Sequence, residues 1–582
     1  PVAICRLKRV AADHKDDISS RLPVIPAQKN GKKVACIGAG PASLTVANDL
    51  LPLGYEVVIF EQWDKPGGLM RTNIPAFRLP ETVLAEEIGY IEQMGAQIRY
   101  NSRIDSMNKL LATGGFDAVF VGSGAPKGKE LKLPGRAEGD ANIHIGINWL
   151  ESVAFKHLDK IGEKVLIIGV GNTAMDCCRS SLRLGAKNVK VMARKPRQFF
   201  KASEWELEDA ESENVEIVVN HSPKAFVVEN GRLKGMLFEQ MAYDFDARGR
   251  ITAERVTGET FIAADDVILA IGQENAFPWI ERTIGLDFDK KWDMPVVDKK
   301  TFMSTRPGVF FGGDAAFGHN VWWVTAIGQE NAFPWIENDL GIEFDQWHVP
   351  VVDVQTHQST RPGVFFGGDA AFGPKNIIWA VEHGHQAAIS IHNHCMGQPV
   401  TERLPPTLNL SSRKMGLHEW SYKNDYNPVE RRLVPHVSLV ERFKKISIEV
   451  ELGFDAEQTA KEVERCLNCD IQTVFEARAC IECDACIDIC PTDCLTITRN
   501  GEEAELSQRL RAPRKHPHEP LFVSAPLKHT GRVMVKDEDL CVHCGLCAER
   551  CPTAAWDMQK STINLPHAND HQWPRPTQRK TA

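Results

Sequence analysis

The sequence lacks the features that would send this chain into a membrane or onto nucleic acid. No apolar run approaches the length of a membrane-spanning helix, and we expect no signal peptide. The formal net charge of -9 gives no electrostatic reason to bind nucleic acid or an anionic membrane. We therefore predict a cytoplasmic protein with neither a nucleic-acid partner nor a membrane partner.

Motifs for chemistry on an organic substrate are also missing. The chain shows no thiamine, amidotransferase or catalytic metal motif and no general-base constellation. Cys177 and Cys178 are adjacent, so they lack the spacing of a redox-active dithiol, and we read them as small buried hydrophobes. We predict no catalytic side chain, and we expect packing or surface roles for His383 and His385.

Two cysteine runs near the C-terminus are the most informative feature that is present. Each has the spacing C-x2-C-x2-C-x3-C followed by proline, which is typical of two-cluster bacterial ferredoxins. In that arrangement the fourth cysteine of each run ligates the other cluster. Zinc sites and disulfides are the alternatives, but neither requires two such runs. We therefore predict two [4Fe–4S] clusters, one held by Cys480, Cys483, Cys486 and Cys551, the other by Cys541, Cys544, Cys547 and Cys490. Because eight of the 16 cysteines lie in these runs, the composition indicates a reducing compartment.

The N-terminal third contains a dinucleotide-binding pattern. A buried strand over Lys32–Ile37 leads into a glycine turn, a helix to about Leu51 and a second strand over Glu56–Phe60. The turn and the helix N-terminus offer backbone N–H groups to a pyrophosphate, and the acid that ends the second strand can accept from a ribose hydroxyl. Ser43 replaces the usual third glycine, which we expect to loosen helix–strand packing. The predicted contacts are Gly38, Gly40, Pro41 and Glu61.

A second unit repeats this order. A strand over Lys164–Ile168 precedes a glycine turn, a helix to about Leu184 and a strand over Asn188–Ala193. Arg194 and Lys195 stand where an NAD site would place an acid, which favours the 2′-phosphate of NADP over NAD. A solvated basic loop is the alternative. The predicted contacts are Gly169, Gly171, Asn172, Thr173, Arg194 and Lys195.

Three shorter segments read as strands or turns beside these units. One is Pro66–Leu69, and the other two, Phe116–Gly124 and Asp266–Gln273, resemble crossings between two nucleotide domains. Ordinary strand–turn structure gives the same local pattern. From these segments the predicted cofactor contacts are Gly68, Leu69, Gly124 and Gly272.

An internal duplication follows. Ala270–Glu281 recurs at Ala326–Glu337, and Ser304–Gly318 recurs at Ser359–Gly373. A single flavin needs only one of the two Gly-Gly-Asp turns. Since only the second copy leads into a convincing amphipathic helix, over Asn376–His392, we predict contacts from Gly368 and Asp369, with Asp314 of the first copy as the alternative.

Several linked motifs within residues 1–392 resemble the flavin- and pyridine-nucleotide-dependent family typified by the glutamate synthase small subunit. They are Gly38–Gly40, Pro66–Leu69, Ile74–Pro80, Gly169–Asp176, Ala270–Gln273 and Gly367–Ala370. The resemblance implies FAD in the first unit and NADPH in the second. The cysteine pair Cys466 and Cys469 resembles part of the family's N-terminal iron–sulfur domain, here placed before the ferredoxin module. This order is similar to the flavin subunits of 2-oxoacid:ferredoxin oxidoreductases.

The predicted fold class is α/β, with two nested Rossmann-like domains followed by a bacterial-type 2[4Fe–4S] ferredoxin domain. The expected parts are an N-terminal segment over 1–31, an FAD-binding domain over 32–160 and 266–395, an NAD(P)-binding domain over 161–265, a connector over 396–465, a ferredoxin domain over 466–562 and a tail over 563–582.

These motifs predict an electron-transfer enzyme subunit. A nicotinamide exchanges two electrons as hydride, a cluster accepts one, and FAD converts between the two. The predicted cofactors are therefore FAD, NADP(H) or NAD(H), and two [4Fe–4S] clusters. We expect the chain to serve the catalytic subunits of a 2-oxoacid oxidoreductase complex, with soluble ferredoxin as a further partner. The alternatives are a glutamate synthase-like NADPH donor and a non-catalytic iron–sulfur wiring subunit.

Overall fold

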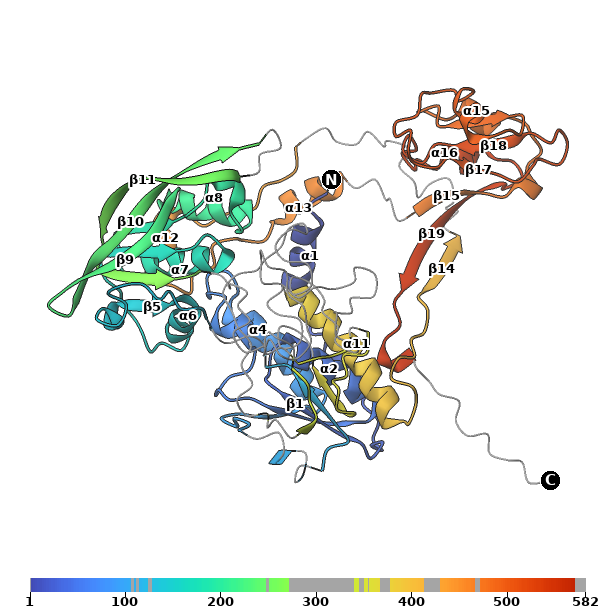
Figure 1. The fold of residues 1–582 in the computed structure, drawn as a ribbon. Helices are drawn as coiled ribbons and strands as arrows, with labels where there is room; N and C mark the ends of the chain where they lie inside the picture. The colour runs from blue at the N-terminus through green and yellow to red at the C-terminus, as the bar shows by residue number, and fades with distance from the viewer. Residues whose placement is uncertain are drawn as a thin grey trace, which may run out of the picture. The chain divides into compact units, whose positions relative to one another are not determined.

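The chain is described by a computed structural model in two compact units (Figure 1). The described residues are 2–105, 109–110, 112, 115–123, 128–246, 251–271, 336, 340–344, 350–353, 355–366, 377–412, 430–465 and 471–570. The larger unit comprises Asp17–Arg403, His436–Leu452 and His567–Ala582, and the smaller one Pro1–Asp16, Leu404–Pro435 and Gly453–Pro566. Among the described helices, none is long and apolar enough to cross a membrane.

The first sheet of the larger unit is parallel, with strand order β13-β4-β1-β2-β3. Its strands are β1 (Lys33–Ile37), β2 (Glu56–Phe60), β3 (Gln97–Arg99), β4 (Ala118–Val121) and β13 (Val364–Phe366). The central strands are apolar on both faces because both are covered. One face packs against helices, and the other against apolar side chains that include Leu110, Leu340 and Ile342. The predicted strands at Lys32–Ile37 and Glu56–Phe60 are confirmed within one residue.

Two helices from distant parts of the sequence lie side by side against this sheet (Figure 1). They are α2 (Pro41–Leu50) and α11 (Ile377–Cys395), while α4 (Glu81–Gln93) also contacts α2. A side chain at Gly384 of α11 would place its Cβ 2.6 Å from the Ala42 carbonyl oxygen of α2. Glycine therefore permits the close helix crossing.

The second parallel sheet has strand order β5-β12-β6-β7-β8. The strands are β5 (Ile143–Ile145), β6 (Lys164–Ile168), β7 (Asn188–Met192), β8 (Glu216–Val218) and β12 (Asp266–Leu269); α6 (Gly146–Ala154), α7 (Asn172–Arg183) and α8 (Glu204–Ser212) accompany them. The predicted α/β class with two Rossmann-like sheets is confirmed. An antiparallel sheet adjoins in sequence, formed by β9 (His221–Glu229), β10 (Arg232–Phe245) and β11 (Ile251–Ala263).

Strands β5 and β12 lie in the second sheet, whereas the expected domain boundaries placed them in the first domain. The boundaries at residues 160/161 and 265/266 assigned β5 and β12 to the first domain. Their hydrogen bonds join β12 to β5 and to β6, so both lie in the second sheet. A strand that leads from one domain to the other has the same apolar pattern as either sheet, so its sequence does not reveal its pairing.

The smaller unit contains two antiparallel three-stranded sheets, ordered β14-β19-β15 and β16-β18-β17. The strands are β14 (Thr407–Ser412), β15 (Ile471–Phe475), β16 (Leu495–Thr498), β17 (Phe522–Val523), β18 (Val533–Lys536) and β19 (Trp556–Asn564), with short helices α14 (Ala485–Asp488), α15 (Glu503–Ser507) and α16 (Leu546–Arg550). Apolar side chains and cysteines of both runs share one core, which includes Phe475, Met534 and Trp556.

Part of the expected connector packs within the smaller unit. Its C-terminal end forms α13 (Ala456–Val463), and Asp455 and Gln458 form a capping box at the start of this helix. The buried Glu462 carboxylate accepts the Ala3 N–H, which precedes α1 (Ile4–Asp13), at 2.8 Å. The connector also supplies β14, which pairs with β19 and which the sequence analysis did not predict.

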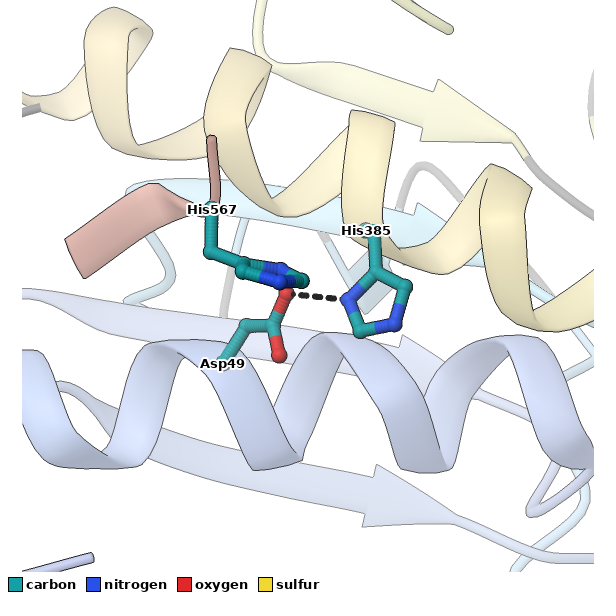
Figure 2. Close-up of side chains that lie close together, drawn as sticks. All are labelled: Asp49, His385 and His567. Atoms are coloured by element: carbon teal, nitrogen blue, oxygen red, sulfur yellow. Dashed lines mark hydrogen bonds and ion pairs between the residues drawn. The ribbon is translucent and has the colours of Figure 1, made fainter. Parts of the chain in front are cut away.

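The first residues of the expected tail, up to residue 570, contain defined secondary structure. Strand β19 runs to Asn564, and Ala568 is fully buried in the core formed by α2 and α11. Figure 2 shows the neighbouring side chains: His385 and Asp49 form a 2.6 Å hydrogen bond, and the His567 ring lies 4.9 Å from the His385 ring, centroid to centroid. His385 thus joins two helices, in line with the packing role expected for it.

Candidate functional site

The first glycine turn brings the end of β1 against the end of β4. Gly38 has a left-handed φ of +87°, and a Cβ there would lie 2.9 Å from the Gly122 carbonyl oxygen. Gly40 caps α2, whose first residue is Pro41. Ser43 is fully buried, and a Cβ on Gly122 would lie 2.3 Å from its hydroxyl oxygen. The expected loosening at Ser43 is therefore offset by the missing side chain of Gly122.

A second pair of glycines closes on this turn. The Gly67 N–H donates to the Ala39 carbonyl at 2.9 Å, and a Cβ on Gly68 would lie 2.9 Å from the Gly40 Cα. Helix α3 (Leu69–Thr72) starts directly afterwards. The structure thus brings Gly68 and the start of α3 against Gly40, which belongs to a separate sequence motif.

Glu61 is buried beneath the first turn, with only 4% of its surface exposed. Its carboxylate accepts the Ala39 N–H at 2.8 Å and the Trp63 N–H at 3.0 Å. Burial raises the pKa of Glu61, although these backbone donors act in the opposite direction. Since each carboxylate oxygen has a second lone pair, Glu61 can hold the turn and still accept from a ribose hydroxyl.

The second glycine turn has the same construction. Gly169 has φ +122°, and a Cβ there would lie 2.1 Å from the Ala270 carbonyl oxygen. Gly171 caps α7 and has open space where its side chain would stand. Asn172 begins the helix and accepts the Ser203 N–H at 3.0 Å, while Thr173 follows in the first turn. The N-terminus of α7 therefore offers backbone N–H groups to an anion.

The basic residues after β7 differ in whether their side chains form ion pairs. Arg197 pairs with Glu204 at 2.7 Å and with Glu211 at 2.5 Å, and these partners raise its pKa. Arg194 is exposed, and the Lys195 ammonium lies 5.8 Å from the centre of the Phe199 ring. Within the described chain neither Arg194 nor Lys195 forms an ion pair, so both are available to an anionic ligand.

An ion-pair network joins the Ile74–Pro80 motif to the Gly169–Asp176 motif. The sequence predicted no contact between these two motifs. Arg78, in the Ile74–Pro80 motif, donates to both oxygens of Asp176 at 2.8 and 2.9 Å and also pairs with Glu206. Burial raises the pKa of Glu206 to about 7. The opposite charges in two quoted motifs were the signal that could have identified this pair.

Cys177 and Cys178 in α7 are fully buried. Burial raises the pKa of both thiols, and the Cys178 thiol donates to the Met175 carbonyl. Their predicted role as small buried side chains is confirmed.

The two cysteine runs line two cavities, and each cavity takes one cysteine from the other run. The first cavity is lined by Cys480, Cys483, Cys486 and Cys551, and the second by Cys541, Cys544, Cys547 and Cys490. These are the two crossed sets expected from the spacing. A further thiol, Cys494, lines the second cavity and was missed because it lies outside the cysteine spacing.

The donor set at each cavity fits an iron–sulfur cluster. All these cysteines are free thiols, and the Glu482 N–H donates to the Cys480 sulfur at 3.4 Å. The Cys494 thiol lies 3.4 Å from the Cys490 sulfur, and this contact lowers the pKa of Cys490. Thiolates are the ligands of such clusters, so four converging thiols match the group.

Some predicted residues fall outside the described chain: Gly124, Gly272, Asp314, Gly368, Asp369, Cys466 and Cys469. Strand β13, which ends one residue before Gly367, belongs to the second copy of the duplication and pairs with β4. The second copy therefore supplies a strand of the first sheet.

Comparison with known proteins gives two family matches. Residues 32–329 match the family described as "Pyridine nucleotide-disulphide oxidoreductase", and residues 479–555 match "4Fe-4S dicluster domain". The first match ends before β13 and so includes the first copy of the duplication, whereas the hydrogen-bonded strand comes from the second copy.

Three curated relatives show the extent of the similarity. The NADP(+)-dependent formate dehydrogenase subunit beta of Moorella thermoacetica is 31% identical over 76% of this chain and 55% of its own length. The NADPH-Fe(3+) oxidoreductase subunit beta of Geobacter sulfurreducens is 31% identical over 80% of this chain and 66% of its own. The glutamate synthase [NADPH] small chain of Escherichia coli is 32% identical over 56% of this chain and 72% of its own. The chain thus spans between about half and two thirds of the first two relatives.

Proposed function

Because the chain belongs to the pyridine nucleotide-disulphide oxidoreductase family and carries a 4Fe-4S dicluster domain, we propose that it passes electrons between NADPH and its clusters through FAD. It is an NAD(P)H-dependent oxidoreductase subunit with domains for FAD and NAD(P) and two [4Fe–4S] clusters. The observation that carries the proposal is the crossed lining of the two cavities in a chain that also has two glycine turns.

FAD belongs in the first glycine turn. Gly38 and Gly40 leave room for a pyrophosphate, Pro41 starts the helix beneath it, and Glu61 is placed to accept from the ribose. Gly68 and Leu69 border the same turn. When bound, FAD supplies the conversion of a two-electron hydride into single electrons.

NADPH belongs in the second turn. Gly169, Gly171, Asn172 and Thr173 form the anion-binding start of α7. Arg194 and Lys195 follow the next strand and have no competing ion pair in the described chain, which favours the 2′-phosphate of NADPH. The clusters belong to the two crossed sets of cysteines.

The chain serves as the electron-donating or electron-accepting subunit of a multisubunit oxidoreductase. The relatives support the alternative of an NADPH-linked subunit, as their names include formate dehydrogenase, Fe(3+) oxidoreductase and glutamate synthase. None of these three names mentions the 2-oxoacid chemistry that the sequence order favoured. We therefore assign the partner as a catalytic oxidoreductase subunit, and soluble ferredoxin remains a predicted further partner.

The test uses the purified chain without its partners under anaerobic conditions. NADPH should bleach the flavin absorbance and reduce a viologen dye. A non-catalytic wiring subunit would do neither, although dithionite would still reduce its clusters. Chemical analysis should find about eight iron atoms per chain, and about four would mean that one cavity is empty.

The choice between the two Gly-Gly-Asp turns needs its own test. Because β13 of the second copy joins the first sheet, Asp369→Ala should lower FAD occupancy more than Asp314→Ala. FAD loss in the Asp314 variant alone would assign the flavin contact to the first copy.

A further inference from the structure

The two cluster cavities are built on matching backbone positions, which allows their linings to be compared residue by residue. Counted from the first cysteine of each run, the left-handed residues coincide: Glu482 with His543, Asp484 with Gly545 and Asp493 with Ala554. Each run also places its third cysteine in a short helix, α14 or α16. A difference between matched positions is therefore a difference between the surroundings of the two clusters.

Four matched lining positions differ in polarity. At one of them the first cavity has the indole N–H of Trp556 where the second has Leu495. The other three differ in the opposite direction, and two of these involve charged side chains. Phe475 of the first cavity corresponds to Lys536 of the second, Asp484 to Gly545, and Ala555 to Cys494. The first cavity thus has an aromatic ring, a carboxylate and a methyl group. At the same positions the second has an ammonium group, no side chain and a thiol.

Lys536 places a cation inside the second cavity's wall. Only 1% of its surface is exposed, and its ammonium pairs with Glu538 at 2.8 Å and donates to the Thr473 carbonyl at 3.4 Å. The Glu538 side chain is 46% exposed, so solvent screens its negative charge more than it screens the buried ammonium.

Cys494 adds to the same cavity a thiol that can donate a hydrogen bond once Cys490 is a thiolate ligand. It is 5% exposed and lies 3.4 Å from the sulfur of Cys490, the ligand that reaches across from the first run. In the first cavity the corresponding Ala555 offers no donor. Asp484 adds negative charge there instead, but its side chain is 46% exposed, so solvent screens it as it does Glu538, and Arg532 at 3.7 Å offsets it further. The buried ammonium of Lys536 is therefore the largest charge difference between the two cavities.

We propose that the cluster in the second cavity has the higher reduction potential, so that electrons collect there. Reduction adds one negative charge to a cluster. A buried ammonium and a thiol donor stabilise that charge, while a carboxylate opposes it. This inference rests on the proposed function, which places a cluster in each cavity.

The test is a redox titration of the purified chain with mediators, followed by electron paramagnetic resonance. We expect two separate midpoint potentials. Lys536→Met should lower the higher one and leave the lower one in place, and Phe475→Leu, which changes no charge, should move neither. Cys494→Ala should lower the same higher potential, while Cys494→Ser, which is similar in size to alanine and keeps a donor, should lower it less.

Three results would overturn the inference. The first is a single midpoint potential for both clusters of the unaltered chain. The second is an unchanged higher potential in both Lys536→Met and Cys494→Ala, and the third is a shift of the lower potential in either variant. Loss of one cluster in Cys494→Ala would also overturn it, because Cys494 would then be a ligand. The titration uses mediators and dithionite rather than NADPH. Failure of the proposed function, in which NADPH reduces no cluster, is therefore seen separately.

Discussion

Replacing Arg194 by alanine should weaken the use of NADPH far more than the use of NADH. Arg194 is exposed and forms no ion pair within the described chain, so binding a 2′-phosphate breaks no existing contact. Arg197 is the matched control, because it stands in the same segment but already pairs with Glu204 and Glu211.

The magnitude follows from the hydrogen bond to the 2′-phosphate that the substitution removes. A hydrogen bond to a charged group contributes about 1.5–3 kcal/mol, and an exposed site belongs at the lower end. At about 1.4 kcal/mol for each factor of ten, the KM for NADPH should rise roughly tenfold in Arg194→Ala. In Arg197→Ala it should rise less than about twofold, since that guanidinium would have to leave two carboxylates to reach a phosphate.

The assay is anaerobic flavin or dye reduction with NADPH and NADH as separate substrates. The KM for NADH should stay unchanged in both variants because NADH has no 2′-phosphate. Equal use of NADH and NADPH by the unaltered chain would refute the reasoning, as would an effect of Arg197→Ala as large as that of Arg194→Ala.

Three further outcomes are expected. Cys551→Ser should damage the cluster of the first cavity rather than the cluster held by the other cysteines of its own run. The paramagnetic signal of the first-cavity cluster should then be lost, and loss of the second-cavity signal instead would contradict the crossed sets. Gly169→Ala should abolish flavin reduction by NADPH and lower the unfolding temperature, because its Cβ would lie 2.1 Å from the Ala270 carbonyl oxygen. An unchanged reduction rate and unfolding temperature would disprove this. Burial raises the folded-state pKa of Glu206 from 4.5 to about 7, so the contribution of this group to stability is largest below pH 4.5 and is lost as pH rises through about 7. Urea unfolding of Glu206→Gln should lack this part of the pH dependence, and pH profiles identical to those of the unaltered chain would count against it.

The sequence predicted the local elements of both nucleotide units and left their pairing open. Strands β1, β2 and β6 were found within one residue because glycine turns and apolar runs are local signals. The membership of β5 and β12 in the second sheet depends on hydrogen bonds between distant strands, which no local pattern encodes.

At the cluster sites, too, the sequence predicted what a local pattern encodes and missed what depends on the fold. Spacing alone led to the two crossed cysteine sets that the cavities bring together. Lys536 and Cys494 were missed, since they reach the second cavity only through the folding of β18 and of the turn after Cys490. The contact of Arg78 with Asp176 likewise joins motifs that are distant in sequence.

The central claim is that one chain converts hydride electrons into single electrons on its clusters. The most direct measurement is an anaerobic titration with NADPH in which flavin absorbance and the paramagnetic signals of the clusters are followed in the same samples. We expect the flavin to bleach and the cluster signals to appear without any partner protein. A flavin that NADPH bleaches while the clusters stay oxidised, although dithionite reduces them, would contradict the account.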